Sequence, residues 1–231
     1  MSELTVERLF DNPPLTGTLP LQPKWSPDGS IVTFLRPAAD DRERLDLWRL
    51  DVASGERSLW IDARELMGDE SGLSDAEKAE RERKRLFATG ITSYAFSPDG
   101  ERLLLPVDGV GHLYELDGRT LNAFTPAGTR QTDFRFSPKG HYVSYVRAGN
   151  LYVYDIEGGT ERAITSDGGG TIANGIADFI AQEEMHRFEG HWWSADEQRL
   201  AFTRSDETPV EVSRRYEIDA ETINVIEQRY P

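Results

Sequence analysis

Two adjacent glutamates, Glu183 and Glu184, lie in the stretch DFIAQEEMHRFEGHWW (residues 178–193), between an apolar run and a pair of tryptophans. Neighbouring carboxylates repel each other, so pairing them gives the fold no stability. An ammonium group has three N–H donors, and two carboxylates can accept most of them in charge-assisted hydrogen bonds of about 1.5–3 kcal/mol each. The pair can be a solvated acidic patch, but its spacing suits the binding of one cation.

Other catalytic arrangements do not occur in the sequence. It has no G-x-S-x-G elbow, no H-E-x-x-H, no P-loop and no cysteine, so we expect no catalytic residue, no metal and no cofactor in this chain. His186 and His191 flank the glutamates but match no known metal site, and His112 and His141 lie in repeat strands or turns, where a structural role is expected. Glycoside hydrolysis needs carboxylates about 5 Å or more apart across a sugar, which adjacent residues on one loop do not provide.

The composition narrows the classes of partner. The chain has 231 residues and a formal net charge of -15, which argues against binding to nucleic acid or to an anionic membrane surface. It contains no apolar run long enough for a transmembrane helix. The start, MSELTVERLFDNPP, lacks a secretory signal, so we expect a cytoplasmic protein, or a periplasmic one if a signal has been removed.

A repeat organises the sequence. Four segments share an aromatic residue, a serine, a short turn and a β-rich run: WSPDGSIVTFLR from Trp25, FSPDGERLLLPV from Phe96, FSPKGHYVSYVR from Phe136 and WSADEQRLAFTR from Trp193. Three of them are followed by a second shared unit, in the forms LDLWRLDVASGE, GHLYELDGRTLN and GNLYVYDIEGGTE. Proline presets φ in such turns and glycine supplies the positive φ that closes a hairpin, so each unit predicts four strands.

A four-stranded unit of roughly 40 residues is typical of a β-propeller blade. We therefore expect an all-β fold, a partial β-propeller of about three complete blades plus the start of a fourth, with a helical insertion. Residues 1–24 would form an N-terminal segment and residues 25–231 the amino-terminal portion of the propeller. Propellers usually close with about four to eight blades, so the chain would be part of a larger propeller. A β-sandwich with similar turns is the alternative.

Two insertions interrupt the repeat. Residues 63–88 have helical character, with basic residues gathered near their end in the run RERKR from Arg81 to Arg85. Residues 172–191 hold the two glutamates, and residues 176–186 within them can form a short helix with Ile176, Phe179 and Ile180 packed inward.

At this point the sequence resembles the dipeptidyl peptidase IV branch of the prolyl oligopeptidase family, most closely its bacterial type. The resemblance rests on TVERLF, on WSPDG with DLWRLD, on LSDAEKAERERKRLFATGITSYAFSPDG and on DFIAQEEMHRFEGHWWSADEQRLAFTRSDETPV, in that order, followed by EQRYP. It implies a serine exopeptidase that removes X-Pro or X-Ala dipeptides from free amino termini. Its propeller would be eight-bladed and its α/β-hydrolase domain would carry the catalytic triad.

The resemblance also implies roles for particular residues. Glu183 and Glu184 match the family's double-glutamate motif, which binds the substrate's α-ammonium group. Arg81 is our choice for an arginine that reaches the substrate backbone or carboxylate, with Arg83 and Arg85 as weaker alternatives. The hydrolase domain is not in this chain, so we expect no activity from the chain alone, and we expect the full-length protein to be a homodimer.

Two other functions stay open at this stage. The chain can belong to a non-enzymatic propeller that serves as a protein-binding scaffold, because SPDG repeats also occur in such proteins. It can also belong to another hydrolase of the prolyl oligopeptidase family, although such members would not be expected to carry the double glutamate.

Overall fold

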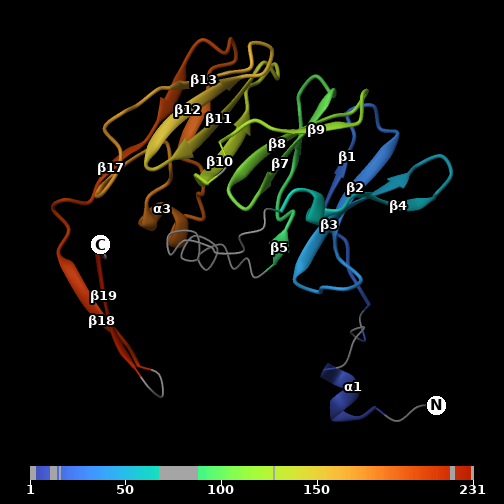
Figure 1. The fold of residues 1–231 in the computed structure, drawn as a ribbon, viewed down its shortest axis with the longest axis horizontal. Coiled ribbons are helices and arrows are strands. Elements are labelled where there is room, and N and C mark those ends of the chain that lie inside the picture. The colour runs from blue at the N-terminus through green and yellow to red at the C-terminus, as the bar shows by residue number, and fades with distance from the viewer. Residues whose placement is uncertain are drawn as a thin grey trace. The chain divides into compact units, whose positions relative to one another are not determined.

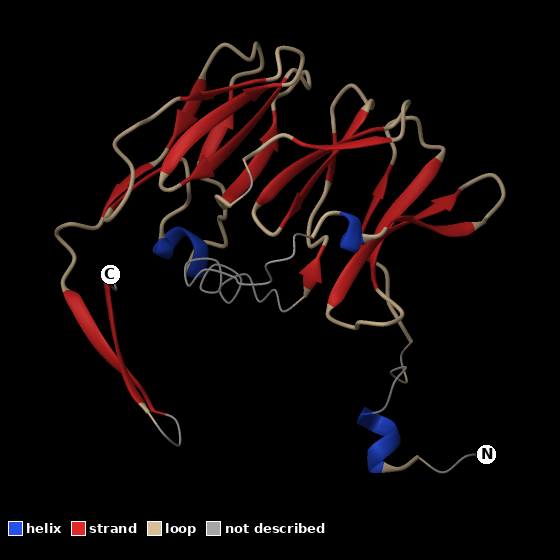
Figure 2. Ribbon diagram, in the orientation of Figure 1, coloured by secondary structure: helices blue, strands red, loops and turns tan. Residues whose placement is uncertain are grey.

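The computed structural model describes residues 4–10, 15, 17–67, 88–126, 128–218 and 222–229. Strands, drawn red in Figure 2, make up most of the described elements. The chain forms two compact units, Met1–Ala127 and Gly128–Pro231.

The first unit contains two antiparallel sheets whose strands follow one another in chain order (Figure 1). The first sheet consists of β1 (Leu21–Trp25), β2 (Ile31–Pro37), β3 (Arg44–Asp51) and β4 (Arg57–Ile61), with β5 (Thr89–Gly90) parallel to β3. The second consists of β6 (Ala95–Phe96), β7 (Arg102–Val107), β8 (Val110–Glu115) and β9 (Thr120–Ala123). Their shared core includes Leu35, Leu47, Ile91, Leu103 and Leu105, all fully buried.

The second unit contains one further sheet of four strands, built in the same order. It consists of β10 (Gln131–Phe136), β11 (Tyr142–Arg147), β12 (Asn150–Asp155) and β13 (Thr160–Ala163). After it come three strand pairs: β14 (Ile172–Asn174) with β17 (Arg204–Asp206), β15 (His191–Trp193) with β16 (Leu200–Phe202), and β18 (Val212–Ile218) with β19 (Ile223–Arg229).

A sheet of four antiparallel strands in chain order is the unit from which propellers are built. The described part of the chain holds three such sheets, and β15 with β16 begins the fourth repeat. The predicted fold class, an all-β partial β-propeller, is therefore confirmed.

Helical structure is sparse in the described residues. It consists of α1 (Val6–Phe10), the single 3-10 turn η1 (Ala63–Glu65) and α3 (Phe179–Glu183). The turn η1 opens the predicted insertion 63–88, but residues 68–87, including the predicted helix and Arg81, lie outside the described residues. Within the described ranges, no helix is long and apolar enough to cross a membrane.

The serine of each repeat turn holds the turn closed. The Ser26 hydroxyl donates to the Asp28 carboxylate at 2.5 Å and accepts the N–H of Ile31 at 3.1 Å. Gly29 then has a φ of +69°, a conformation that favours glycine. These hydrogen bonds lower the pKa of Asp28 to about 2, the Ser26 hydroxyl being the largest cause, so the turn keeps its carboxylate charged at neutral pH. The serine-to-backbone bond recurs in the three later turns, at Ser97, Ser137 and Ser194.

Neighbouring repeats are joined by a buried polar contact at one repeated position. In the first unit, Thr33 of β2 donates its hydroxyl to the Tyr94 hydroxyl at 2.9 Å, and Tyr94 donates to the carbonyl of Gln22 at 2.7 Å. In the second unit, Ser144 of β11 bonds the His191 ring at 2.9 Å. Thr33 and Ser144 follow the aromatic residue of their repeats at the same spacing, and Tyr94 and His191 precede theirs at the same spacing. The repeat therefore specifies the joint as well as the strands.

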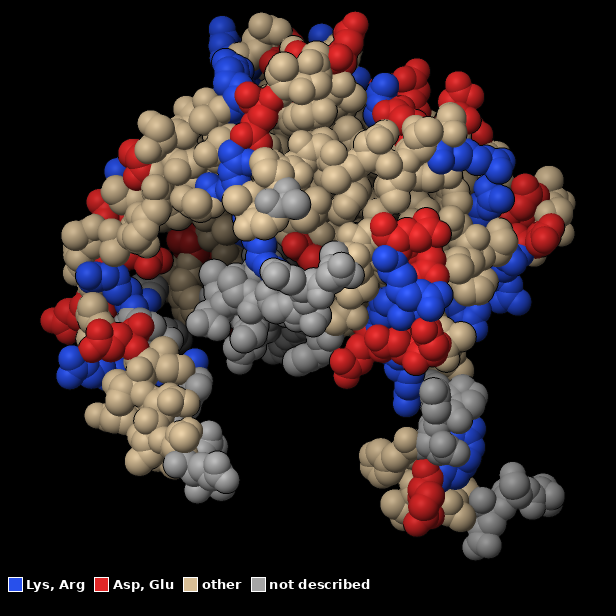
Figure 3. Space-filling view, viewed as in Figure 1, with Lys and Arg blue, Asp and Glu red and all other residues tan. Residues whose placement is uncertain are grey.

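Charged side chains of both signs are interleaved on the face drawn in Figure 3. Some of these charges form ion pairs with residues close by in the sequence. In the first unit, Arg44 pairs with Asp40 at 2.6 Å and Arg64 pairs with Asp62 at 2.5 Å. Arg44 is buried, whereas Arg64 is exposed, and ion pairs at the surface contribute little stability, typically about 0–1 kcal/mol each, so the sheets depend mainly on their apolar cores and buried joints.

Replacing Tyr94 by phenylalanine tests the joint of the first unit. The change leaves the carbonyl of Gln22 without its donor, so we expect Tyr94→Phe to lower the free energy of unfolding by about 1–3 kcal/mol in urea titrations. The matched control is Tyr142→Phe, because the Tyr142 hydroxyl has no hydrogen-bond partner among the described residues. Equal unfolding midpoints for Tyr94→Phe and the control would show that the joint contributes nothing.

Candidate functional site

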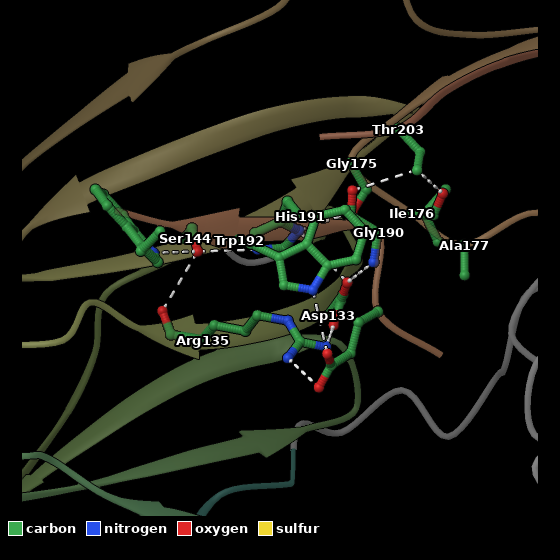
Figure 4. A network of polar contacts seen from close by, with 12 residues as sticks. Asp133, Arg135, Ser144, Gly175, Ile176, Ala177, Gly190, His191, Trp192 and Thr203 are labelled. Carbon is green, nitrogen blue, oxygen red and sulfur yellow. Dashed lines mark hydrogen bonds and ion pairs between the residues drawn. The ribbon is translucent and has the colours of Figure 1, made fainter. Parts of the chain in front are cut away.

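The loop that carries the two glutamates is closed at its base by backbone contact. Ile176 and Glu189 form an isolated antiparallel bridge, and the Thr203 hydroxyl lies 3.0 Å from the Ile176 carbonyl and 3.2 Å from the Gly190 carbonyl (Figure 4). A Cβ on Gly190 would lie 2.3 Å from backbone atoms of Ile176. Only glycine allows the two ends of the loop to approach this closely.

Inside the loop, α3 is held by a polar cap and by small buried residues. The Asp178 side chain accepts the N–H of Ala181 at 2.8 Å, as an N-cap should, and Ala181 is buried. The buried Gln182 donates its side-chain amide to the carbonyl of Ala177 at 2.7 Å. The predicted short helix is therefore present over Phe179–Glu183, and Phe179 is half-buried.

The prediction that Ile180 packs inward was wrong, because its side chain is 42% exposed. In a helix of five residues the inward face holds few positions, and the buried side chains of Ala181 and Gln182 occupy them here.

Glu183 is the last residue of α3 and Glu184 is its C-cap. Both side chains are exposed, and neither has a hydrogen-bond or ion-pair partner among the described residues. The carbonyl groups at the end of a helix carry partial negative charge, so this is an unfavourable place for carboxylates. The described surroundings thus leave two negative charges uncompensated and accessible, an arrangement that suits a cationic ligand.

The nearest described cation in the sequence, Arg187, is already used by other groups. Its guanidinium donates to the carbonyl of Glu189, lies 3.9 Å from the Asp178 carboxylate and stacks 5.8 Å from the centroid of the Trp192 ring. The loop therefore holds its own arginine without neutralising Glu183 or Glu184.

Directly after the loop, His191 fixes β15 to the third sheet. Its ring is fully buried, with Nδ1 2.7 Å from the carbonyl of Gly175 and Nε2 2.9 Å from the Ser144 hydroxyl (Figure 4). Because a carbonyl only accepts, Nδ1 carries the proton and Nε2 accepts from Ser144. Both ring nitrogens are used by the protein, so His191 is a structural residue and not a metal ligand with His186.

A charged network surrounds this histidine. Asp133, whose carboxylate lies 3.4 Å from His191 Nδ1, also accepts the N–H of Gly190 at 3.3 Å and pairs with Arg135 at 2.5 Å. Arg135 in turn pairs with Glu189 at 2.9 Å. Two charged side chains of β10, Asp133 and Arg135, thus contact the base of the loop at Gly190 and Glu189 (Figure 4).

Sequence reasoning located the two glutamates and did not find the residues that hold them. Asp133, Arg135 and Gly190 belong to no recognisable motif, and Ser144 lies within a β-rich run that does not distinguish it from its neighbours. The repeat could have indicated the role of His191, because His191 precedes Trp193 at the same spacing as Tyr94 precedes Phe96. The predicted substrate-contacting Arg81, with its alternatives Arg83 and Arg85, lies outside the described residues and stays a prediction.

Protonation of His191 should destabilise the fold. Burial lowers the pKa of His191, and the opposing effects of Asp133 and the Gly175 carbonyl do not restore it. The unfolded chain then binds the proton more readily than the folded one, so stability is complete above about pH 6.5 and is lost as the pH falls below it. We expect a loss of up to about 1.4 kcal/mol per pH unit in urea titrations between about pH 6.5 and 5, and a smaller loss in His191→Gln.

The matched control for this change is His186→Gln, because His186 is an exposed histidine of the same loop. We expect the control to keep the pH dependence of the parent protein. An identical pH dependence in His191→Gln and the parent would contradict the assignment of this effect to His191.

Comparisons with known proteins show the family and support the fold. The family model described as "Dipeptidyl peptidase IV (DPP IV) N-terminal region" matches residues 97–231. The crystal structure of Porphyromonas gingivalis dipeptidyl peptidase 4 aligns with a TM-score of 0.65 and 25% identity, over 90% of this chain and 28% of that one. A probable dipeptidyl-aminopeptidase B of Arthroderma gypseum is 44% identical over 52 residues, which are 21% of this chain and 6% of that protein.

A second such protein, from Chaetomium globosum, is 42% identical over 50 residues, or 20% of this chain and 5% of its own length. The chain thus spans only a small part of the proteins that it resembles. Its matched region includes the third sheet, the glutamate loop and the β18–β19 hairpin. The chain belongs to the family of the dipeptidyl peptidase IV N-terminal region.

Proposed function

We propose that this chain is the amino-terminal propeller part of a serine dipeptidyl peptidase, which releases X-Pro or X-Ala dipeptides from free amino termini. Within it, Glu183 and Glu184 would bind the α-ammonium group of the peptide. The observation that carries the proposal is the exposed pair of carboxylates at the end of α3, which has no partner in the part of the chain that the structure describes and stands on a loop closed at its base by hydrogen bonds. Membership of the family supports it.

The chemistry of an exopeptidase gives the pair a definite task. The enzyme must measure its cut from the amino terminus, and a fixed anionic anchor provides the starting point. A free ammonium gains charge-assisted hydrogen bonds from both carboxylates, whereas an internal peptide bond gains none. Once the terminus is held, the second peptide bond is positioned at a serine of the α/β-hydrolase domain, which we propose for the remainder of the protein.

One part of this proposal concerns residues outside the described ranges. We propose that Arg81 contacts the substrate backbone or carboxylate, with Arg83 and Arg85 as alternatives. We also propose that the chain divides into an N-terminal segment of residues 1–24 and a propeller portion of residues 25–231, interrupted by insertions at 63–88 and 172–191.

Neutralising either glutamate should weaken recognition of the amino terminus. In the full-length protein, we expect Glu183→Gln and Glu184→Gln each to lower kcat/KM for Gly-Pro chromogenic substrates by about 10- to 100-fold, the equivalent of one charge-assisted hydrogen bond. The matched control is Glu157→Gln, an exposed carboxylate in the turn between β12 and β13, which should keep parental activity.

Two results would contradict the proposal. Parental kcat/KM in both glutamine variants would remove the assigned role of the pair. Absence of hydrolysis by the full-length protein on X-Pro and X-Ala substrates would favour the alternative, a protein-binding propeller without peptidase activity.

The β18–β19 hairpin supports the further proposal that the full-length protein is a homodimer. One face of the hairpin carries the Arg214–Glu227 ion pair. The pairing register places five apolar residues on this same face: Val212, Tyr216 and Ile218 on one strand, and Ile223 and Val225 on the other. All five are exposed in this chain. A two-stranded hairpin is marginally stable by itself, so an apolar face of this kind gains from burial against a second copy.

A charge on the apolar face of the hairpin should break the dimer. We expect Ile223→Asp to convert the full-length protein from dimer to monomer in size-exclusion chromatography with light scattering. The neighbouring change Asn224→Asp adds the same charge on the opposite face and should leave the dimer intact. A dimer of unchanged mass in Ile223→Asp would exclude the hairpin as the interface.

A further inference from the structure

The turn that opens the third repeat lacks a group that the other turns possess. In the first, second and fourth turns an aspartate, Asp28, Asp99 or Asp196, accepts the hydroxyl of the turn serine and the backbone N–H two residues on. In the third turn, Ser137-Pro138-Lys139-Gly140, the same position is Lys139, which has no acceptor to offer.

A carboxylate from the next repeat bonds this turn instead, at a different backbone N–H from the one that the aspartates accept. Glu197 accepts the backbone N–H of Lys139 at 2.6 Å through one carboxylate oxygen and lies 2.7 Å from His141 Nδ1 through the other. A hydrogen bond from the Ser137 hydroxyl also reaches it. Burial by itself would raise the pKa of Glu197, but these hydrogen bonds outweigh burial and lower it, so the carboxylate is charged at neutral pH.

Glu197 occupies an unfavourable backbone position to do this. It stands at the fourth position of its own turn, where the other three turns have Gly29, Gly100 and Gly140, and its φ is +61°. A non-glycine residue is disfavoured in this conformation. Its side chain is nevertheless only 2% exposed, whereas His141 is 64% exposed. A strained, buried glutamate that satisfies another turn has a role beyond its own turn.

The same interface contains two further contacts of β15. The Trp193 ring stacks on Tyr142 with centroids 5.7 Å apart, and its indole N–H donates to the Ser144 hydroxyl at 2.9 Å. Glu197 therefore fixes the end of β15 that leads away from the glutamate loop, while His191 and Gly190 fix the end that leads into it.

We propose that Glu197 is a positioning residue: its carboxylate completes the turn Ser137–Gly140 of the preceding blade and locks β15 in the place that orients Glu183 and Glu184. The role of Glu197 in fixing β15 does not depend on any activity, whereas its effect on substrate binding rests on the proposed function above. Two departures from the repeat, Lys139 for aspartate and Glu197 for glycine, thus compensate each other across the blades.

The Glu197→Gly variant distinguishes the proposed link between blades from an effect confined to the turn of Glu197, because the two predict different changes in the urea midpoint. Within its own turn, glycine relieves the positive φ, so a purely local role predicts an equal or higher urea midpoint. The lock predicts a lower midpoint, together with faster backbone hydrogen exchange in residues 177–188 of the full-length protein. Glu197→Gln keeps one acceptor for the Lys139 N–H and should show a smaller change in both measurements.

The double variant Lys139→Asp with Glu197→Gly separates the turn from the link between blades. It gives both turns the regular sequence, so the midpoint should recover toward the parental value, while exchange in residues 177–188 should stay fast. For Gly-Pro substrates, Glu197→Gly and the double variant should raise KM by roughly 10- to 100-fold with kcat changed much less.

The outcomes that overturn the proposal are separate from those that overturn the proposed function. A parental or higher midpoint in Glu197→Gly, with parental exchange in the loop, overturns the lock. Parental KM in an active Glu197→Gly enzyme overturns the positioning role. If the parent protein hydrolyses no dipeptide substrate, the proposed function fails, and the midpoint and exchange measurements still decide the lock.

Discussion

The Ser144 hydroxyl joins the fourth repeat to the third, and the candidate site depends on this joint. It bonds His191 and Trp193, the two ends of β15, each at 2.9 Å. Because β15 is three residues long, contacts at both ends fix the whole strand. The glutamate loop closes on itself directly before β15, so the place of Glu183 and Glu184 follows from the place of this strand. A buried polar joint has this effect only when every partner is satisfied, as here.

The equivalent joint in the first unit shows that this is a property of the repeat. Thr33 and Tyr94 meet at 2.9 Å, the same separation as Ser144 and His191, although the side chains differ. Tyrosine donates onward to a carbonyl, and histidine does the same through Nδ1. Two chemically different rings therefore satisfy one geometry. The second of them can also be protonated, which gives the joint beside the candidate site a dependence on pH that the first lacks.

The blades could be predicted because their information is local. Serine, proline and glycine at fixed positions specify the turns, and β-branched and aromatic runs specify the strands, as FSPDGERLLLPV illustrates. The glutamate pair was found for the same reason, since adjacent like charges are conspicuous in one stretch of sequence. What holds the pair was not predictable in this way. Asp133 reaches Gly190 and Arg135 reaches Glu189 across long stretches of chain, and such contacts depend on how strands are aligned between repeats.

The position of Ile180 illustrates the same limit on a smaller scale. Apolar spacing placed it inward, but a five-residue helix capped by Asp178 has only one narrow inward face, and Ala181 and Gln182 fill that face. The cap and the closure at Gly190 determine the orientation, and hydrophobicity does not. This explains how α3 can end in two carboxylates that have no partner among the described residues. Its fixed shape comes from a capping bond, a close backbone approach and buried side chains, none of which requires Glu183 or Glu184, so the described residues leave both charges available to a ligand.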